Sequence, residues 1–449
     1  MPSIESEGTH SYRVTALPRT LDRSRFAWLL PTLALLIAAA LPACSPDEFP
    51  GGRKLAPEAL SEPEAPAIDG TPDPEPYARG LWILAEGSVR VLDDATRIDP
   101  LVQRALALGA TDLFVQVYRG GRAFYPGPDF VERAPGVAET GPDTLRMLLD
   151  AAHGQGLRVH AWVNVLSLST RRDARMIEDL GREIILVDRQ RRSLLDYPDF
   201  DLPEPDRRFY RMGTRGLYLD PASPAVRERT IATFRDLVLR YPEFDGLHLD
   251  YIRHPGVLPF SPGSRFGVGL DFGYGEASRA LYRAETGNPD PIDGAPPGVV
   301  RRSNDWDEWQ RRQVTTLVEE IAQETRTARP GLVLSAAVIA YVDRAYLSLA
   351  QDWRRWLESG ALDLAMPMIY TVDDRLLRYQ LEDLAGWPLA DRIWPGLGSW
   401  LFAENPKRAL AQLDLLRGAV FSGEMLFSDD AIADSPALFE AFAKPVSNP

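Results

Sequence analysis

Cysteine is almost absent from this chain of 449 residues, and Cys44 is the single one. A disulfide framework, a zinc site built from thiolates and an iron–sulfur cluster are therefore excluded, because each needs several cysteines. Histidine is also scarce, and its five residues show no His-Glu-x-x-His spacing. We predict no metal site and no cofactor; the alternative left open is a calcium or magnesium site built from loop carboxylates.

Basic residues are fewer than acidic residues in this chain. The 64 Asp and Glu residues exceed the 50 Lys and Arg residues, which gives a formal net charge of −14. An acidic chain binds phosphate backbones poorly, so we predict no nucleic-acid partner. The chain also lacks a Gly-x-Ser-x-Gly motif, which argues against an esterase. Its hydrophobic content of 45% is that of a globular protein, so disorder along the whole chain is excluded.

No apolar run is long enough for a typical membrane span, which needs about 20 residues. The strongest run extends from Phe26 to Leu41, contains Pro31 and follows an arginine-rich stretch. This order is typical of a signal peptide, in which a basic region precedes an apolar core. We therefore predict that residues 1–43 are a signal peptide. The alternative is a plain anchor helix followed by a chance cysteine.

The apolar run ends in Leu41-Pro42-Ala43-Cys44, which resembles a bacterial lipobox. Acylation of Cys44 would anchor the protein to a membrane without making it span the bilayer. Ser45, rather than Asp, follows the cysteine, which resembles lipoproteins sorted to the outer membrane. The predicted location is therefore the bacterial cell envelope, with lipidation at Cys44 and a membrane contact through that lipid.

Residues 44–78 differ in composition from the rest of the chain. From position 45 to position 78, eight prolines and eight acidic residues leave room for few large apolar side chains. Such a segment buries too little surface to offset its ordering entropy, so we predict a disordered tether. Residues 79–449 form the remaining, globular domain.

Eight short apolar stretches alternate with amphipathic, helix-like stretches in this domain. The strand-like stretches are Gly80–Ala85, Asp112–Tyr118, Leu157–Val163, Gly246–Ile252, Leu332–Val338, Leu362–Tyr370, Ile393–Ser399 and Ala419–Ser422. Strands separated by helices form parallel βαβ units, and eight such units predict an α/β fold of the (β/α)₈ TIM-barrel type. A doubly wound open sheet is the competitor, but no glycine-rich phosphate loop follows the first strand.

Two connections are much longer than the usual 2–6 residues. They run from Leu166 to about Leu219 and from Pro255 to Ser303, after the third and fourth predicted strands. Both leave the carboxyl ends of strands, which is the face where a TIM barrel builds its active site. We therefore predict that they form walls around a substrate.

Polar and aromatic side chains alternate into the barrel near several strand ends. Side chains two residues apart share a face of a strand. The pairs predicted to face the same cleft are Gln116 with Tyr118, Trp162 with Asn164, His248 with Asp250, and Met368 with Tyr370. Buried polar groups are costly unless they are paired or wet, so this concentration predicts a binding cleft. Separate, satisfied polar groups in the core are the alternative.

Blocks of sequence along almost the whole domain match a known family. They are Arg79-Gly80-Leu81-Trp82, Phe114-Val115-Gln116-Val117, His160-Ala161-Trp162-Val163-Asn164, Leu219-Asp220-Pro221, the stretches Asp245 to Pro255 and Asp363 to Tyr370, Pro395-Gly396-Leu397-Gly398 and Phe421-Ser422. In this order the chain resembles the glycosyl hydrolase-like family 10 barrels. The resemblance implies a TIM barrel, a polysaccharide substrate and, for bacterial members, a lipoprotein that acts on peptidoglycan glycan strands.

A wider resemblance to chitinase-type barrels tests the chemistry. Those barrels carry Asp-Gly-x-Asp-x-Asp-x-Glu on the fourth strand, with the final Glu as the general acid. Aligned on Asp245-Gly246, this sequence keeps the inner Asp as Asp250 but places Ile252 where the acid would be. A substrate-assisted chitinase mechanism is therefore not expected.

Glycoside hydrolysis usually needs two carboxyl groups. Asp250 is the first candidate, and Glu424, just past the eighth predicted strand, and Glu86, just past the first, are candidates for the second. Substrate-binding candidates are Gln116, Tyr118, Trp162, Asn164, His248, Arg253, Tyr370 and Trp400. Aromatic rings in this set suit stacking on sugars, and Arg253 suits a charged sugar or a carboxylate.

The sequence therefore predicts a glycoside hydrolase that acts on an envelope polysaccharide, with peptidoglycan glycan strands as the expected substrate. One alternative is a barrel that binds carbohydrate without cleaving it, which the missing strand-four Glu favours. A second alternative is an envelope scaffold that binds other proteins.

Overall fold

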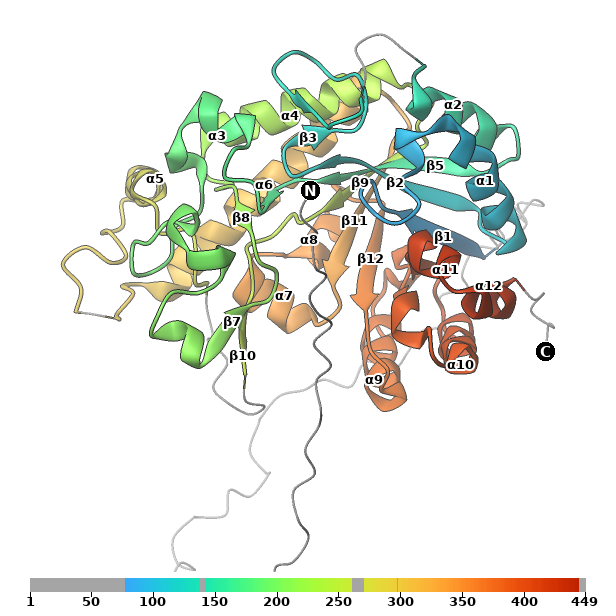
Figure 1. Ribbon diagram of the computed structural model, residues 1–449. Coiled ribbons are helices and arrows are strands. Elements are labelled where there is room, and N and C mark those ends of the chain that lie inside the picture. Colours follow the sequence, from blue (N-terminus) through green and yellow to red (C-terminus); the bar gives the residue numbers. More distant parts are fainter. Residues whose placement is uncertain (1–76, 138–141, 261–269, 297, 444–449) are drawn as a thin grey trace, which may run out of the picture. The chain divides into compact units, whose positions relative to one another are not determined.

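Eight parallel strands close into a barrel in the computed structural model (Figure 1), which describes residues 77–137, 142–260, 270–296 and 298–443. Strands β1 and β14 pair with each other, and β1 also pairs with β2, so the sheet has no open edge between its first and last strands. The predicted TIM barrel is confirmed. The barrel strands are β1 (Ala78–Ile83), β2 (Asp112–Arg119), β5 (Arg158–Asn164), β9 (Gly246–Asp250), β11 (Val333–Ile339), β12 (Leu364–Ile369), β13 (Gly396–Gly398) and β14 (Gly423–Phe427).

Helices follow the strands and cover the outer face of the barrel (Figure 1). Those between or after barrel strands are α1 (Ile98–Ala107), α2 (Thr144–His153), α4 (Pro224–Arg240), α6 (Ser303–Ala328), α7 (Val342–Leu349), α8 (Trp353–Glu358), α9 (Asp374–Ala385), α10 (Pro406–Arg417), α11 (Asp429–Ala433) and α12 (Pro436–Phe442). Helix α4 begins at Pro224, where proline fits because the first helical residue needs no amide donor. Helix α6 ends just before Pro330, which cannot continue it. No helix within the described ranges is both long and apolar enough to cross a membrane.

Strand side chains alternate between two apolar clusters. One face of each strand packs against the helices, and the other fills the barrel with a smaller cluster that includes Trp82, Phe114, Trp162, Met366 and Met425. Aromatic rings contact each other inside the barrel. The Phe114 ring, for example, stacks on the His160 ring with 4.4 Å between the ring centres. Because the interior is filled, a substrate can enter only at its rim.

The eighth strand begins later than the sequence suggested. We predicted Ala419–Ser422, but the strand is β14 (Gly423–Phe427), and the predicted segment is the connection that follows α10. The reason is packing, because Met425 and Phe427 fill the barrel whereas Ala419 packs on the helix layer. The shift of the strand changes the position of Glu424 relative to it.

The connections on the carboxyl side of the barrel contain short elements of their own. Two-residue strands β3 (Arg122–Ala123) and β4 (Glu132–Arg133) lie between β2 and α2. Between β5 and α4 lie β6 (Ser167–Ser169), α3 (Arg175–Leu180), β7 (Tyr210–Met212) and β8 (Leu217–Tyr218); between β9 and α6 lie β10 (Val257–Pro259) and α5 (Glu276–Thr286).

The two long connections contact each other. Strands β7 and β10 pair antiparallel, and Asp188 of the first connection bridges to Phe272 of the second. The two insertions therefore hold each other, and both gather on one side of the barrel (Figure 1).

The predicted signal peptide (1–43) and most of the predicted tether (44–78), including Cys44, lie outside the described residues.

Candidate functional site

Asp250 is the last residue of β9 and points into the barrel mouth, in line with His248 two residues earlier. Its Oδ2 accepts a hydrogen bond from the Trp162 indole Nε1 at 3.2 Å. Its Oδ1 accepts one from the backbone N–H of Tyr251 at 2.6 Å. The residue is only 6% exposed, so a rigid strand end and two donors hold the carboxyl in one orientation.

The surroundings of Asp250 determine its charge. Burial raises its pKa above the usual range, while the Arg253 guanidinium, the Tyr251 amide and the Trp162 indole act in the opposite direction. The arrangement therefore favours a carboxyl that keeps its proton to higher pH than a free aspartic acid does.

His248 lies one layer deeper than Asp250. The Trp82 indole donates to its Nε2 at 3.0 Å, and its Nδ1 lies 2.9 Å from the Ser335 hydroxyl. Nε2 is therefore an acceptor, and the proton is on Nδ1. Burial lowers its pKa well below the usual value, so the ring is neutral. The predicted contact between His248 and substrate is wrong for this structure, because the side chain is completely covered.

Gln116 and Asn164 reach the same end of the barrel as Asp250. The Gln116 side-chain amide donates to Asn164 Oδ1 at 3.2 Å, and its oxygen accepts from the Ala85 backbone at 3.3 Å. Asn164 is the register partner of Asp250 in the β5–β9 pair. The two amides therefore form a polar edge beside the carboxyl.

Aromatic rings surround the same end. Phe427, the last residue of β14, lies with its ring centre 5.6 Å from Tyr370, 5.4 Å from Trp400 and 6.3 Å from Trp162. Trp400 is 43% exposed and is the ring in this group most available to a ligand. Sequence reasoning missed Phe427 because the eighth strand had been placed too early; the inward alternation from Met425 was the available signal.

Tyr118 does not reach the mouth. The pairing of β2 with β5 shifts register between Gln116 and Tyr118, as a β-bulge does, and this reverses the face on which Tyr118 lies. Its ring packs edge-on against Phe234 of α4, at 5.6 Å between ring centres. The prediction that Tyr118 shares a cleft with Gln116 is therefore wrong.

Glu424 lies at the opposite end of the barrel from Asp250. It is the second residue of β14, is fully buried, and its Oε1 lies 2.8 Å from Arg79 Nε and 2.8 Å from Arg417 Nη2. Burial raises its pKa to about 7, although Arg417 opposes this shift. Its neighbours in the strand show that it faces the helix layer, so the predicted position at the rim is wrong.

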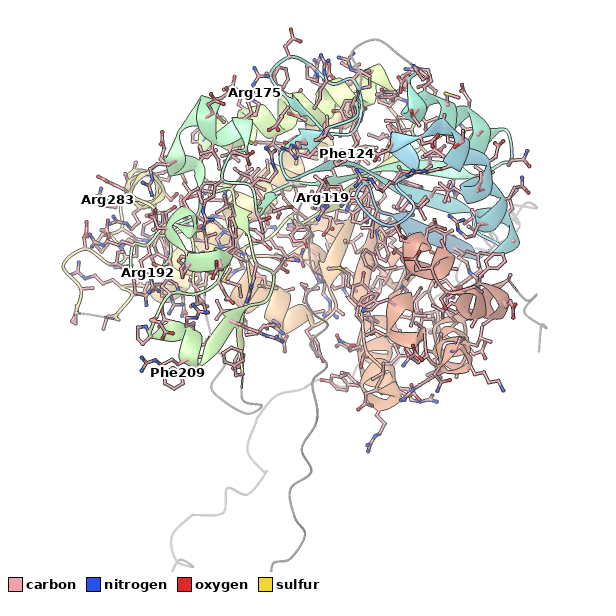
Figure 2. The ribbon with its side chains drawn as sticks, viewed as in Figure 1. Arg119, Phe124, Arg175, Arg192, Phe209 and Arg283 are labelled. Carbon is pink, nitrogen blue, oxygen red and sulfur yellow. The ribbon has the colours of Figure 1, made fainter. Side chains whose placement is uncertain are left out.

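Glu86 remains at the rim. It follows β1, is partly exposed and forms an ion pair with Arg119, which ends β2 and is labelled in Figure 2. Burial and the charge of Asp250 raise the pKa of the Tyr251 phenol to about 12, and Arg119 is close enough to oppose this shift. Glu86, just after β1, and Asp250, the last residue of β9, thus both lie at the carboxyl ends of barrel strands.

Arg253 follows Asp250 by three residues and is 7% exposed. Its guanidinium lies 4.8 Å from the centre of the Tyr251 ring, a cation–π contact. Burial lowers its pKa, but Tyr218, Tyr251 and Asp250 together raise it above the usual value. Tyr218 belongs to β8 in the first long connection, so the insertion takes part in building the site.

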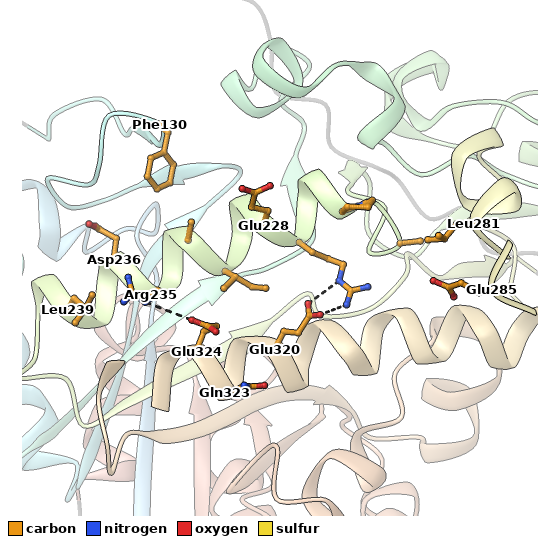
Figure 3. Close-up of a pocket in the computed structure, with 15 residues that line it drawn as sticks. Phe130, Glu228, Arg235, Asp236, Leu239, Leu281, Glu285, Glu320, Gln323 and Glu324 are labelled. Atoms are coloured by element: carbon orange, nitrogen blue, oxygen red, sulfur yellow. Dashed lines mark hydrogen bonds and ion pairs between the residues drawn. The ribbon is translucent and has the colours of Figure 1, made fainter. Parts of the chain in front are cut away.

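A separate groove lies on the outer face of the barrel, between α4 and α6 (Figure 3). Ion pairs link its two walls, from Arg227 to Glu320 and from Arg235 to Glu324. None of the sequence-predicted site residues lines it. In the described part of the chain, no group of three or more His, Cys, Asp or Glu side chains is arranged to hold a metal ion.

Comparison with known proteins identifies relatives of this barrel. The glycosyl hydrolase-like 10 family matches residues 77–388. Glycosyl hydrolase DigH of Escherichia coli strain K12 is 27% identical over 455 residues, covering 88% of this chain and 92% of DigH. Glycosyl hydrolase YngK of Bacillus subtilis strain 168 is 23% identical over 317 residues, covering 66% of this chain and 51% of YngK.

Solved structures share the fold. The GH42 β-galactosidase Gan42B of G. stearothermophilus, solved as a catalytic mutant, aligns with a TM-score of 0.52 and 12% identity, covering 82% of this chain and 56% of that one. Alpha-L-fucosidase isoenzyme 2 of Paenibacillus thiaminolyticus aligns with a TM-score of 0.51 and 14% identity, covering 82% of this chain and 48% of that one. The chain thus spans about half the length of these structures, and the likeness is one of fold. Because the family match extends over more than half of the sequence, the chain belongs to the glycosyl hydrolase-like 10 family.

Proposed function

We propose that this chain hydrolyses glycosidic bonds in a polysaccharide of the bacterial cell envelope, with peptidoglycan glycan strands as the substrate. The observation that carries this proposal is the Asp250 carboxyl, fixed at the end of β9 by Trp162 and the Tyr251 amide among rim aromatics. The two relatives named above are called glycosyl hydrolases, which supports the reaction class.

Asp250 suits the role of proton donor. The leaving sugar oxygen must receive a proton as the glycosidic bond breaks, and burial of Asp250 raises its pKa and so favours the protonated form that this role needs. After the bond breaks, Asp250 is ionised, and Arg253 stabilises that charge. The same carboxyl can then accept a proton from water.

Glu86 is the second carboxyl in this proposal. Its side chain is partly exposed at the rim, and it forms an ion pair with Arg119 at the end of β2. An ionised carboxylate there can activate water or attack the anomeric carbon, which are the two roles open to the partner of the acid.

Sugar binding is assigned to the rim around these carboxyls. The exposed ring of Trp400, supported by Tyr370 at 4.8 Å, offers an apolar face for a pyranose. Gln116 and Asn164 are as buried as Trp162, so their amides form the polar edge beside Asp250 rather than an exposed sugar contact. Trp162 is mostly buried and acts by holding Asp250 rather than by stacking on the sugar.

A barrel that binds glycan without cleaving it is the second candidate. It is favoured by one observation, that Glu424, one of the two candidates for the second carboxyl, is buried and paired with Arg79 and Arg417 away from Asp250. A chain used as a lectin would still need the aromatic rim, but would not need a carboxyl with a raised pKa.

Incubation with purified peptidoglycan separates these functions. The purified protein is mixed with glycan strands, intact or stripped of their peptides, and soluble fragments are identified by mass. A hydrolase releases fragments with new reducing ends over time. Binding of the strands to the protein with no fragment released would contradict the proposed reaction and support the binding function.

The proposed location is the outer membrane, through a lipid on Cys44. The support is the order of basic region, apolar core and Leu41-Pro42-Ala43-Cys44, followed by Ser45. A lipid anchor joined to the predicted acidic tether would let the barrel reach the cell wall while it stays attached to the membrane.

A further inference from the structure

The turn that carries Glu86, residues 84–89, is held at both of its ends by one carboxylate. It directly follows β1. Asp430 Oδ2 accepts a hydrogen bond from the Leu84 backbone N–H at 3.3 Å, and Asp430 Oδ1 accepts one from the Val89 backbone N–H at 2.9 Å. One side chain therefore bridges the entry and the exit of the turn, with Glu86 between them.

Asp430 is itself fixed in place. It is the second residue of α11, is only 4% exposed, and lies in a helix that contacts β1 (Figure 1). The preceding residue, Asp429, accepts two hydrogen bonds from the Arg104 guanidinium of α1, at 2.7 and 2.6 Å. Strands β1 and β14 pair in the closed barrel, so the helix after β14 lies next to the turn after β1. The carboxylate of Asp430 is therefore a rigid acceptor for the turn.

Gly87 lets the turn close over this carboxylate. A Cβ atom at position 87 would lie 2.0 Å from Asp430 Oδ1 and 2.4 Å from Asp430 Cγ, which is closer than any van der Waals contact. The requirement for glycine is one of space, because Gly87 is not among the residues with a positive φ. A larger residue would push the carboxylate away from the Val89 amide.

Glu86 is held through its neighbours in the turn. The Ala85 backbone N–H donates to Gln116 Oε1 of β2 at 3.3 Å, and the Glu86 carboxylate pairs with Arg119 at the end of the same strand. The turn is thus tied to β2 on one side and to Asp430 on the other. A partly exposed side chain on a fixed backbone has fewer positions open to it, which is what a reacting carboxyl needs.

We propose that Asp430 is a positioning residue for Glu86, and that it acts with Gly87 to hold the turn that carries the second carboxyl of the reaction. This inference rests on the proposed function, since it concerns the role assigned there to Glu86. Asp430 is buried beneath the turn and does not touch the glycan. Its loss should therefore lower kcat by misplacing Glu86, and should leave KM near that of wild type, because the exposed Trp400 ring belongs to another segment.

Hydrogen exchange tests the hold on the turn without any substrate. Backbone exchange across residues 84–89 is measured by mass for the full-length wild type, for Asp430→Asn and for the control Asp434→Asn, which alters an exposed carboxyl at the end of α11. Asparagine keeps only one of the two acceptor oxygens, so it cannot accept from both ends of the turn as the carboxylate does. We expect exchange of the Leu84 and Val89 amides to become about tenfold faster in Asp430→Asn and to stay unchanged in the control. Unchanged protection in Asp430→Asn would overturn the inference.

A double-mutant cycle tests whether Asp430 acts through Glu86. Cleavage of purified peptidoglycan glycan strands is measured for wild type, Asp430→Asn, Glu86→Gln and the double variant. We expect Asp430→Asn to lower kcat about tenfold with KM within about twofold of wild type. The same change should cause no further loss once Glu86→Gln is present, because the residue that it positions has already lost its function.

Gly87→Ala tests the same contact from the side of the turn. Its added methyl group displaces the Asp430 carboxylate, so kcat should fall as it does in Asp430→Asn. The matched control is Gly386→Ala, where an added Cβ would lie 3.4 Å from its nearest neighbour, an ordinary contact distance. The control should cleave at the wild-type rate.

The outcomes separate this inference from the proposed function. If Asp430→Asn lowers kcat equally with and without Glu86→Gln, or lowers the melting temperature alone, Asp430 does not act through Glu86; the inference is then overturned and the hydrolase stands. If Glu86→Gln cleaves at the wild-type rate, both the inference and the assignment of Glu86 as second carboxyl are wrong. If the wild-type chain releases no fragments, the proposed function is wrong, and hydrogen exchange alone decides whether Asp430 holds the turn.

Discussion

Two indole donors position the polar residues at the centre of the barrel. Trp162 Nε1 donates to Asp250, and Trp82 Nε1 donates to His248 in the layer beneath. Both indoles also fill the barrel interior, so they combine packing with hydrogen bonding. Replacement of either ring should therefore affect stability, and only the Trp162 change should also affect the titration of Asp250.

Trp162→Phe should change the pH dependence of turnover. The indole lowers the pKa of Asp250, so its loss should raise that pKa further and move the alkaline limb of the pH–rate profile to higher pH. Loss of positioning should lower kcat/KM by about tenfold. Trp394→Phe is the control, because it removes an indole that donates at 2.8 Å to Ser422, away from Asp250. An unshifted limb in Trp162→Phe would contradict the assignment of that limb to Asp250.

Asp220 gives a prediction about stability. Burial raises its pKa to about 6, against hydrogen bonds from the Ser278 hydroxyl and the Ala222 amide. Because the folded pKa lies above the unfolded value of 3.8, the folded state loses stability as pH rises from about 4 to 6. Asp220→Asn removes this loss, so the variant should gain up to about 3 kcal/mol relative to wild type across that window. Urea unfolding at pH 4 and pH 7 measures it, and a constant difference would contradict the assignment.

The face and the end of the barrel that a side chain reaches could be predicted from the sequence where the strands are regular. Gln116, Asn164 and Asp250 reach one end because side chains alternate strictly. Tyr118 was misplaced because a bulge in β2 has no signature in the local sequence pattern.

Among the secondary-structure elements, strand boundaries decide which face of the barrel a residue belongs to. The error in the bounds of the eighth strand moved Glu424 from the expected rim to the amino-terminal end of β14. There it connects three elements, since it accepts from Arg79 of β1 and Arg417 of α10. Sequence alone could not show this, because the apolar stretch continues across the real boundary.

Glu424→Gln should destabilise the barrel without affecting catalysis. It leaves Arg79 and Arg417 buried or half-buried without their carboxylate, which costs about 3 kcal/mol or more. The melting temperature should fall, while kcat/KM of the folded fraction should stay near that of wild type. A variant that unfolds normally but has lost turnover would make Glu424 a catalytic candidate again.

The pairing between the two long connections, through β7 and β10, could not be predicted from the sequence. Strands β7 and β10 are three residues each and belong to different connections. The lengths and positions of the connections suggested substrate walls, but a pairing between short segments far apart in the chain leaves no periodic pattern. The barrel itself was predictable because its signal repeats eight times.

For the molecule as a whole, the proposed lipid at Cys44 would join the barrel to a membrane. The support for this expectation is the Leu41-Pro42-Ala43-Cys44 sequence. Cys44→Ser should release the protein from the membrane fraction or block removal of the signal peptide, because the thiol that would carry the lipid is gone. Fractionation and the mass of the mature chain measure both effects. A variant that is processed and membrane-bound as before would contradict lipidation.

Proton transfer from Asp250 to the glycosidic oxygen is the step on which the proposed hydrolysis depends. The rate of glycan cleavage and the affinity for the same strands are compared for wild type, Asp250→Asn and the control Asp391→Asn, which alters an exposed carboxyl before β13. We predict that Asp250→Asn lowers turnover by about 10³-fold while binding stays within a few-fold of wild type, and that the control has no effect. Wild-type turnover in Asp250→Asn would show that Asp250 is not the proton donor.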